Sequence, residues 1–120
     1  MVELLGSVIK DERRHYAFYR SQAQMRLAKS KRARMLARWT MERLWAPVGT
    51  GVRPQEETDF VVDYLMGNES GLAAARMMDE TLSDLPGLGG LTLIQKAGAD
   101  VAKRVDAVQS EFSSNSGLAP

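Results

Sequence analysis

The chain has 120 residues, of which 44% are hydrophobic and 26% are charged, and it contains no cysteine. This composition is typical of one soluble globular domain and unlike that of a disordered chain. The lack of cysteine excludes disulfides, thiolate metal sites and thiol nucleophiles. No apolar run approaches the roughly 18–20 residues of a membrane span, and the first residues do not resemble a secretory signal. We therefore expect a cytoplasmic protein.

The charges are distributed unevenly along the sequence, although the net charge is only +1. Residues 1–53 contain twelve Lys or Arg against four Asp or Glu, a net of +8, and residues 54–120 contain four against eleven, a net of −7. Either the two halves pair with each other or with neighbouring chains, or the basic half binds an acidic partner or nucleic acid. We favour the structural explanation over a nucleic-acid surface.

The first predicted helix covers about residues 2–28. This segment has no proline, and its single glycine is close to its start. Six side chains recur at spacings of three and four, so they share one face of a helix. A carboxylate within such a stripe costs several kcal/mol on burial unless it is paired, protonated or bound to metal. The stripe is apolar, then ionisable, then aromatic: Leu5, Val8, Glu12, His15, Tyr19 and Gln22.

Four shorter helices are predicted after the first, which makes the class all-α. Ser30 is a plausible N-cap for a basic helix over about 31–45, which ends where proline and two glycines follow. A third helix starts at Pro54 and stops at Gly67, a fourth covers about 70–85, and the last begins near Leu91. The side chains expected to face a core are Leu36, Trp39 and Leu44, then Leu72, Ala75, Met78, Leu82 and Leu85, and then Leu91, Ile94, Gly98, Val101, Val105 and Val108.

The connection at residues 85–91 is rich in leucine as well as in glycine and proline. A segment of this composition is a turn, and its leucines predict that it folds back over the core. The last eight residues are small and polar. We expect a single all-helical domain over residues 1–112 and a flexible tail over 113–120.

The segment Asp11-Glu12-Arg13-Arg14-His15 contains a Glu-x-x-His pair and the only histidine of the chain. At a spacing of three, the carboxylate and the imidazole lie on one helix face, one turn apart. In di-iron helical bundles this spacing lets one helix supply both types of ligand. Such a site also needs a second Glu-x-x-His pair and two more glutamates. The motif therefore indicates di-iron chemistry that one copy of this chain cannot perform alone.

The same five residues resemble the second iron-binding motif of the acyl-carrier-protein desaturases, a branch of the ferritin-like di-iron proteins. In that family the motif lies on the fourth helix of the central bundle. The resemblance implies Glu12 and His15 as iron ligands and Asp11 as a residue that positions a neighbouring group. It also implies a ferritin-like half-bundle and the oxygen-dependent removal of hydrogens from an acyl chain. The chain departs from the family at Tyr16, where desaturases usually carry an acid, and beyond the motif only helix order and rough length are similar.

The missing ligands leave two alternatives open. The chain can correspond to the C-terminal part of a desaturase-like protein, incomplete and inactive by itself, or another copy can complete the site. In a two-fold dimer, antiparallel first helices bring together two copies of Glu12 and two of His15. Glu42 is then the first candidate for a further carboxylate. The apolar stripe of the first helix also predicts a homo-oligomer, because the shorter helices do not cover all of it.

The basic helix supports a different function. Residues 29–43 carry many basic side chains and one acid, with Trp39 between them. Such a surface can bind phosphates with little sequence preference, or, if the resemblance holds, it can receive the acidic acyl carrier protein. The predicted docking residues are Arg32, Arg34 and Arg38. The alternative to an iron protein is thus a non-catalytic helical module that binds an acidic partner or nucleic acid through this helix.

Overall fold

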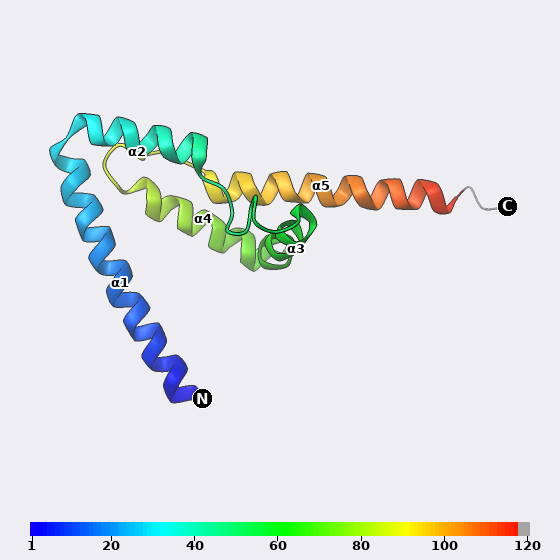
Figure 1. Ribbon diagram of the computed structural model, residues 1–120, viewed down its shortest axis with the longest axis horizontal. Helices are drawn as coiled ribbons and strands as arrows, with labels where there is room; N and C mark the ends of the chain where they lie inside the picture. Colours follow the sequence, from blue (N-terminus) through cyan, green and yellow to red (C-terminus); the bar gives the residue numbers. More distant parts are fainter. Residues whose placement is uncertain (118–120) are drawn as a thin grey trace.

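The structure is a computed structural model that describes residues 1–117, and these residues form five α-helices (Figure 1). The predicted all-α class is confirmed, since the described residues contain no strand beyond one isolated bridge between Thr50 and Arg53. No described helix has both the length and the apolar character to cross a membrane. The helices are α1 (Val2–Lys29), α2 (Lys31–Leu44), α3 (Gln55–Met66), α4 (Glu69–Ser83) and α5 (Leu93–Ser116).

Local sequence signals set the corners between consecutive helices. The side chain of Ser30 accepts a hydrogen bond from the backbone N–H of Ala33 at 3.2 Å, which caps α2 as predicted. Asn68 caps α4 in the same way, accepting from the N–H of Gly71 at 2.9 Å. Gly71 is required at this corner because a Cβ there would clash with the carbonyl oxygen of Leu65. Helices α3 and α4 therefore meet at a tight bend.

The five described helices form the predicted helical bundle, but this bundle is open rather than compact. The radius of gyration is 18.6 Å, whereas a compact domain of this length has about 14 Å. Helices α3, α4 and α5 pack against one another as a body, and α1 packs against α2. Figure 1 shows α1 diverging from α4 toward its N-terminus, and the C-terminal part of α5 extending past the other helices. Long stretches of α1 and α5 thus lie outside the core.

The turn at residues 85–91 packs into the corner between α1 and α2, as the sequence predicts. Leu88 and Leu91 are buried in a cluster with Leu27 of α1. Gly87 has a positive φ of 84°, and a Cβ at this position would lie 2.6 Å from Cβ of Arg34. Only glycine fits both the left-handed backbone and this close approach to α2. Partly buried residues complete the cluster: Ala23, Ala33, Ala37, Met41, Leu82, Leu85 and Leu93.

The predicted inner face of α2 is wrong. Leu36, Trp39 and Leu44 are exposed by 53–67%, and the face that packs on the core carries Ala33 and Ala37 together with Met41 instead. The face with small residues packs inward because it lets the 85–91 turn approach the α2 backbone. The larger side chains of the predicted face would prevent this approach.

The predicted stripes of α4 and α5 are correct in part. Ala75 and Val101 are buried as expected. Leu72, Met78 and Val108 are exposed by 51–66%, because no described element covers the ends and outer sides of these helices. Hydrophobic periodicity thus identified the helices better than it identified the sides that pack.

Helix α5 also runs four residues into the segment predicted as a tail. The hydroxyls of Ser113 and Ser114 donate to the backbone carbonyls of Gln109 and Ser110, one turn earlier. Serines bonded in this way are compatible with a helix, although their composition indicates a loop. Gly117 follows as the C-cap of this helix, and the rest of the predicted tail, residues 118–120, lies outside the described residues.

Helix α5 begins on a buried carboxylate from α4. Asp79 is 1% exposed, and its oxygens accept hydrogen bonds from the N–H groups of Ile94 and Gln95 at 3.0 and 2.9 Å. The Gln95 side chain donates a third bond to it at 3.1 Å. Thr92, at the N-cap position, makes no capping bond with its side chain. A negative charge here also interacts favourably with the positive end of the helix dipole.

We expect Asp79→Ala to lower the free energy of unfolding by about 2 kcal/mol, because it leaves two partly buried N–H groups of α5 without an acceptor. Urea titrations followed by circular dichroism would measure the change. Asp106→Ala, which removes an exposed acid further along α5, is the matched control and should change stability by less than about 0.5 kcal/mol. Equal effects of the two substitutions would contradict the capping role.

A second carboxylate attaches α3 to α5. Asp59 is 8% exposed and accepts two parallel hydrogen bonds from the guanidinium of Arg104, both at 2.8 Å. Gln55 donates a third bond to it at 2.8 Å. The hydrogen bonds from Arg104 hold the pKa of Asp59 below its ordinary value, and they outweigh burial, which acts in the opposite direction.

The lowered pKa of Asp59 predicts a stability that depends on pH. The ionised carboxylate contributes fully above its unfolded pKa of about 4, and this contribution is lost as pH falls through the lower folded pKa. We expect Asp59→Asn to destabilise the protein at pH 7 by about 1 kcal/mol, a modest value because the Arg104 side chain is half exposed. Urea midpoints of both proteins should converge below about pH 4. A difference that stays constant from pH 7 to pH 2 would contradict the prediction.

Candidate metal-binding helix and adjoining grooves

The predicted iron ligands lie on the part of α1 that extends away from the body. Glu12 and His15 are both exposed and one helical turn apart. Asp11 is exposed as well, and it faces Arg14 at 3.8 Å rather than the histidine. Every residue from 1 to 19 is exposed. The ligand pair therefore has no packing partner among residues 1–117.

The described residues bring no further metal ligand to this pair. Nowhere in residues 1–117 do three or more His, Asp or Glu side chains lie together in a group that could hold a metal ion. Glu42, the suggested additional carboxylate, pairs with Arg38 at 2.9 Å. It lines a groove to which α1 contributes no residue. Within residues 1–117 the predicted iron site therefore consists of one carboxylate, Glu12, and one imidazole, His15.

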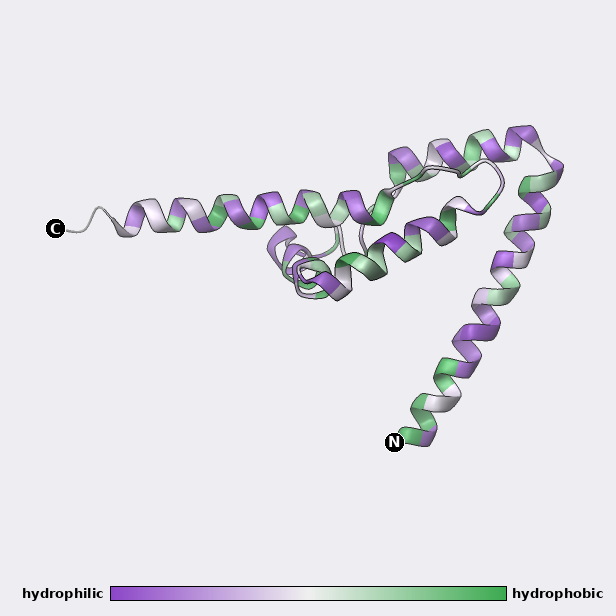
Figure 2. Cartoon of the chain, turned by 180° about the vertical axis from the view of Figure 1, so that it is seen from behind, coloured by the Kyte–Doolittle hydropathy of each residue, from purple (hydrophilic) through white to green (hydrophobic). Residues whose placement is uncertain are grey.

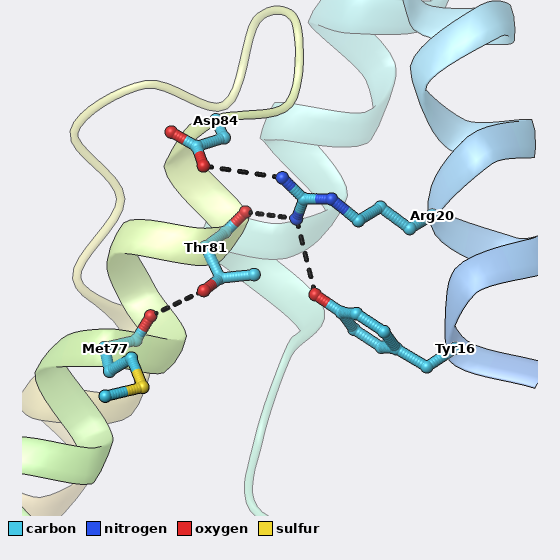
Figure 3. A network of polar contacts seen from close by, with 5 residues as sticks. All are labelled: Tyr16, Arg20, Met77, Thr81 and Asp84. Carbon is cyan, nitrogen blue, oxygen red and sulfur yellow. Dashed lines mark hydrogen bonds and ion pairs between the residues drawn. The ribbon is translucent and has the colours of Figure 1, made fainter. Parts of the chain in front are cut away.

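An arginine attaches the middle of α1 to the end of α4 (Figure 3). The guanidinium of Arg20 donates to the backbone carbonyl of Thr81 at 2.9 Å and to the hydroxyl of Tyr16 at 3.3 Å. It also contacts the carboxylate of Asp84 at 3.4 Å. The Thr81 hydroxyl in turn donates to the carbonyl of Met77 at 2.8 Å. Beyond this contact α1 continues toward its N-terminus without support.

An open groove lies beside this contact, with α1 and α4 as its walls. We call it the α1–α4 groove. Its volume is about 560 Å³, within the range of ligand sites, and its lining is almost entirely apolar. Sequence periodicity does not reveal it, because four helices contribute to it. The lining residues are Tyr16, Tyr19, Arg20 and Ala23 of α1, Met41 of α2 with Trp45, Met77, Met78, Thr81 and Leu82 of α4 with Leu85, and Leu93 and Ile94 of α5.

A second groove, of about 460 Å³, lies between the end of α2, the start of α3 and α5. Its lining is less apolar than that of the α1–α4 groove, and it is bordered by the ion pair of Asp59 and Arg104. Thr58 also lines it, and the buried hydroxyl of this residue has no hydrogen-bond partner in the described chain. A small polar molecule or water could satisfy that hydroxyl. No sequence motif marks this groove, because its residues come from distant positions.

Two of the three predicted docking arginines make hydrogen bonds within the chain. Arg34 donates to the carbonyls of Leu27 and Ala28 at 2.8 and 3.1 Å, which satisfies the C-terminal end of α1. Arg38 donates to the carbonyls of Gly87 and Gly89 at 3.3 and 2.9 Å. Arg32 is exposed. Both Arg34 and Arg38 therefore stabilise the corner around the 85–91 turn.

The uneven charge distribution is hardly compensated within the chain. Of the ion pairs found among residues 1–117, only two join the basic half to the acidic half, Arg20 with Asp84 and, one helical turn apart, Arg53 with Glu57. The other pairs join residues of the same half. The basic and acidic halves are thus both left available to other chains.

Comparisons with known proteins give no match. No family model matches the sequence, and neither a curated protein nor a solved structure matches it. The relation of α1 to di-iron proteins therefore stays a prediction from its motif.

The roles of the α2 arginines can be separated by mutation. We expect Arg34→Ala to lower the free energy of unfolding by about 1–2 kcal/mol, because two carbonyls at the end of α1 lose their donor. Arg32→Ala is the matched control on the same helix, and it should have little effect because its side chain is exposed. Thermal and urea unfolding would measure both. An equal loss of stability in the two variants would contradict the capping role of Arg34.

Proposed function

We propose that the chain is part of a ferritin-like di-iron carboxylate protein related to the acyl-carrier-protein desaturases. In this proposal α1 supplies Glu12 and His15 to iron, and helices other than those of the same copy supply the remaining ligands. The observation that carries the proposal is the position of this pair on a 28-residue helix whose first eighteen residues are all exposed. A metal-binding helix of a bundle would be exposed in this way if it were separated from the helices against which it packs.

The two side chains fit the chemistry of iron, although they are too few for a pair of irons. A carboxylate oxygen and an imidazole nitrogen from positions i and i+3 are the donors that a di-iron bundle takes from one helix. A complete site needs further carboxylates and a second histidine. When bound, such a centre would supply the oxygen-dependent oxidation that the family resemblance implies. Glu12 and His15 hold the metal in this proposal, and Asp11 lies beside them.

The free surface of α1 supports an assembly in which this helix is covered. Isolated helices in water are marginally stable, and most helices in proteins depend on packing of an apolar face. Leu5 and Ile9 are exposed by 56% and 53%. Burying side chains of this size contributes roughly 1.5–3 kcal/mol each. We therefore propose that the protein is oligomeric, or bound to a partner, when it functions.

The alternative function, docking of acyl carrier protein, another acidic partner or nucleic acid on α2, has less support from the geometry. Arg34 and Arg38 are engaged with backbone carbonyls, so binding through them would compete with contacts inside the chain. Arg32 could still contribute to such a surface. We retain this function as the second candidate if α1 binds no metal.

The iron content of the purified protein tests the proposed metal binding directly. Protein expressed with iron and purified without chelator should contain about one iron per chain if two copies share a di-iron site. Glu12→Ala and His15→Ala should both lose the metal. Glu3→Ala, which removes an exposed acid from the same helix, is the control and should retain it. Iron-free protein that becomes more stable on His15→Leu would contradict the proposal.

A further inference from the structure

We propose that the outer face of α2 binds the outer face of α3 from a second copy of this chain. The first face is apolar and basic, and the second is apolar and acidic. The contact involves neither of the predicted iron ligands, and it goes beyond the proposed function by naming an interaction surface and its partner. The α2 outer face consists of Arg32, Met35, Leu36, Trp39 and Arg43, and the α3 outer face consists of Glu56, Glu57, Phe60, Asp63 and Tyr64.

The α2 outer face has large apolar side chains at its centre. Trp39 lies two residues after Ala37, or about 200° around the helix, and Ala37 packs against the buried cluster. Trp39 therefore points away from the core, and it is 53% exposed. Met35 and Leu36, one turn earlier, are both 64% exposed. Figure 2 shows such hydrophobic residues interleaved with charged ones along α2.

Arginines border these apolar side chains at both ends of the face. Arg32 lies seven residues before Trp39 and Arg43 lies four residues after it, so both share its side of the helix. Both are exposed. The only acid of α2, Glu42, pairs with Arg38 at 2.9 Å. The outer face is therefore left with a positive charge.

The α3 outer face has two aromatic rings at its centre. Phe60 lies two residues before the buried Val62, or about 200° around the helix, so it points away from the body. The rings of Phe60 and Tyr64 are stacked with their centroids 6.4 Å apart. These side chains are 71% and 74% exposed. One copy thus leaves a pair of stacked aromatic rings in water.

The charges around these rings are acidic. Helix α3 contains four acids and no lysine or arginine. One acid, Asp59, is buried, and the other three lie within about 60° of Phe60 around the helix. Arg53 approaches Glu57 at 3.6 Å, but both side chains are more than half exposed, so this contact is weak. Arg53 can compensate one of the three outer acids, and the other two leave the face negative.

The chemistry of the two faces favours a protein partner, and their charges favour a second copy. Aromatic residues, methionine and arginine are the types enriched at the centres of protein interfaces. A nucleic-acid backbone would not bury Met35 and Leu36. The two faces have opposite charge and comparable lengths of about 16 and 12 Å along their helices. Each face is thus the complement of a surface that the same chain already carries.

The contact joins two unlike surfaces, and each copy carries both of them. Two copies related by a two-fold axis would form the contact twice and close as a dimer, and copies related in any other way would add head to tail. Both arrangements cover the two faces. The contact also explains why the basic and acidic halves of the chain compensate each other so little within one copy.

An exchange of charge between the two faces tests the contact by sedimentation at micromolar concentration, with a chelator present to exclude metal bridges. The wild-type chain should associate. The α2 variant carries Arg32→Glu and Arg43→Glu, and the α3 variant carries Glu56→Lys and Glu57→Lys. Each alone should be monomeric, because like charges then meet. The control carries Lys10→Glu and Lys103→Glu, two exposed residues outside both faces, and it should associate as the wild type does.

An equimolar mixture of the α2 and α3 variants should associate again. The acidic α2 face of one variant then meets the basic α3 face of the other, and the remaining pair of faces is unchanged. Restored association also shows that both variants are folded, which circular dichroism would verify separately. A monomeric wild-type chain or a mixture that stays monomeric would overturn the proposal. Association retained by either variant alone would overturn it as well, since α2 or α3 would then not be part of the contact.

Iron content, measured on the same proteins purified without chelator, separates this proposal from the proposed function. Neither variant changes Glu12 or His15, so both should contain as much iron as the wild type. Iron-free protein that associates through the two faces supports the contact and removes the proposed function. Iron-loaded protein that is monomeric in the sedimentation test overturns the contact alone.

Discussion

Three leucines, Leu27, Leu88 and Leu91, make the buried contact that joins the two parts of this molecule. Leu27 comes from the end of α1, and the other two come from the turn between α4 and α5. The contact is close because Gly87 approaches Arg34 without a side chain of its own. The direction of α1, and with it the walls of the α1–α4 groove, depends on this corner. Substitutions in the 85–91 turn would therefore change the direction of α1, and with it the position of the α1 side chains that line the groove.

The buried carboxylates show how the body accommodates charge. Asp79 is surrounded by donors at the start of α5, and Asp59 by the guanidinium of Arg104 and the amide of Gln55. Each is paired in the way that burial demands. Glu12 differs from both, because it occupies the apolar stripe of α1 but has water instead of donors around it. The same physical rule that explains the paired acids requires Glu12 to gain a partner once the stripe is covered.

Much of the fold could be predicted from the sequence, because its signals are local. Proline, glycine and the caps at Ser30 and Asn68 mark the ends of the helices, and the leucines of the 85–91 turn predict its return to the core. The inner face of α2 could not be predicted, since Leu36 and Trp39 are as apolar as core residues. What decides their exposure is the close approach of a distant turn to Ala33 and Ala37, which no local pattern encodes.

Only one part of the candidate site, the pair of predicted metal ligands, could be predicted from the sequence. The motif identifies Glu12 and His15 from spacing alone, because one helix carries both. The cap formed by Asp79 and the two grooves depend on residues brought together from three or four elements, and no spacing rule connects those. The hydrogen bonds of Arg34 and Arg38 to backbone carbonyls could not be predicted for the same reason. The sequence pattern of a basic helix is the same whether its arginines face solvent or backbone carbonyls.

The order of residues along the α1 stripe limits how this helix can be covered. It is apolar at the N-terminal end, acidic at Glu12, and apolar again from Tyr16 onward. Any element that covers both apolar segments also covers Glu12, which lies between them. Burial of this carboxylate is favourable only if the covering element supplies a hydrogen-bond donor, a proton or a cation. The position of Glu12 therefore links the burial of apolar surface on α1 to the pairing of its carboxylate.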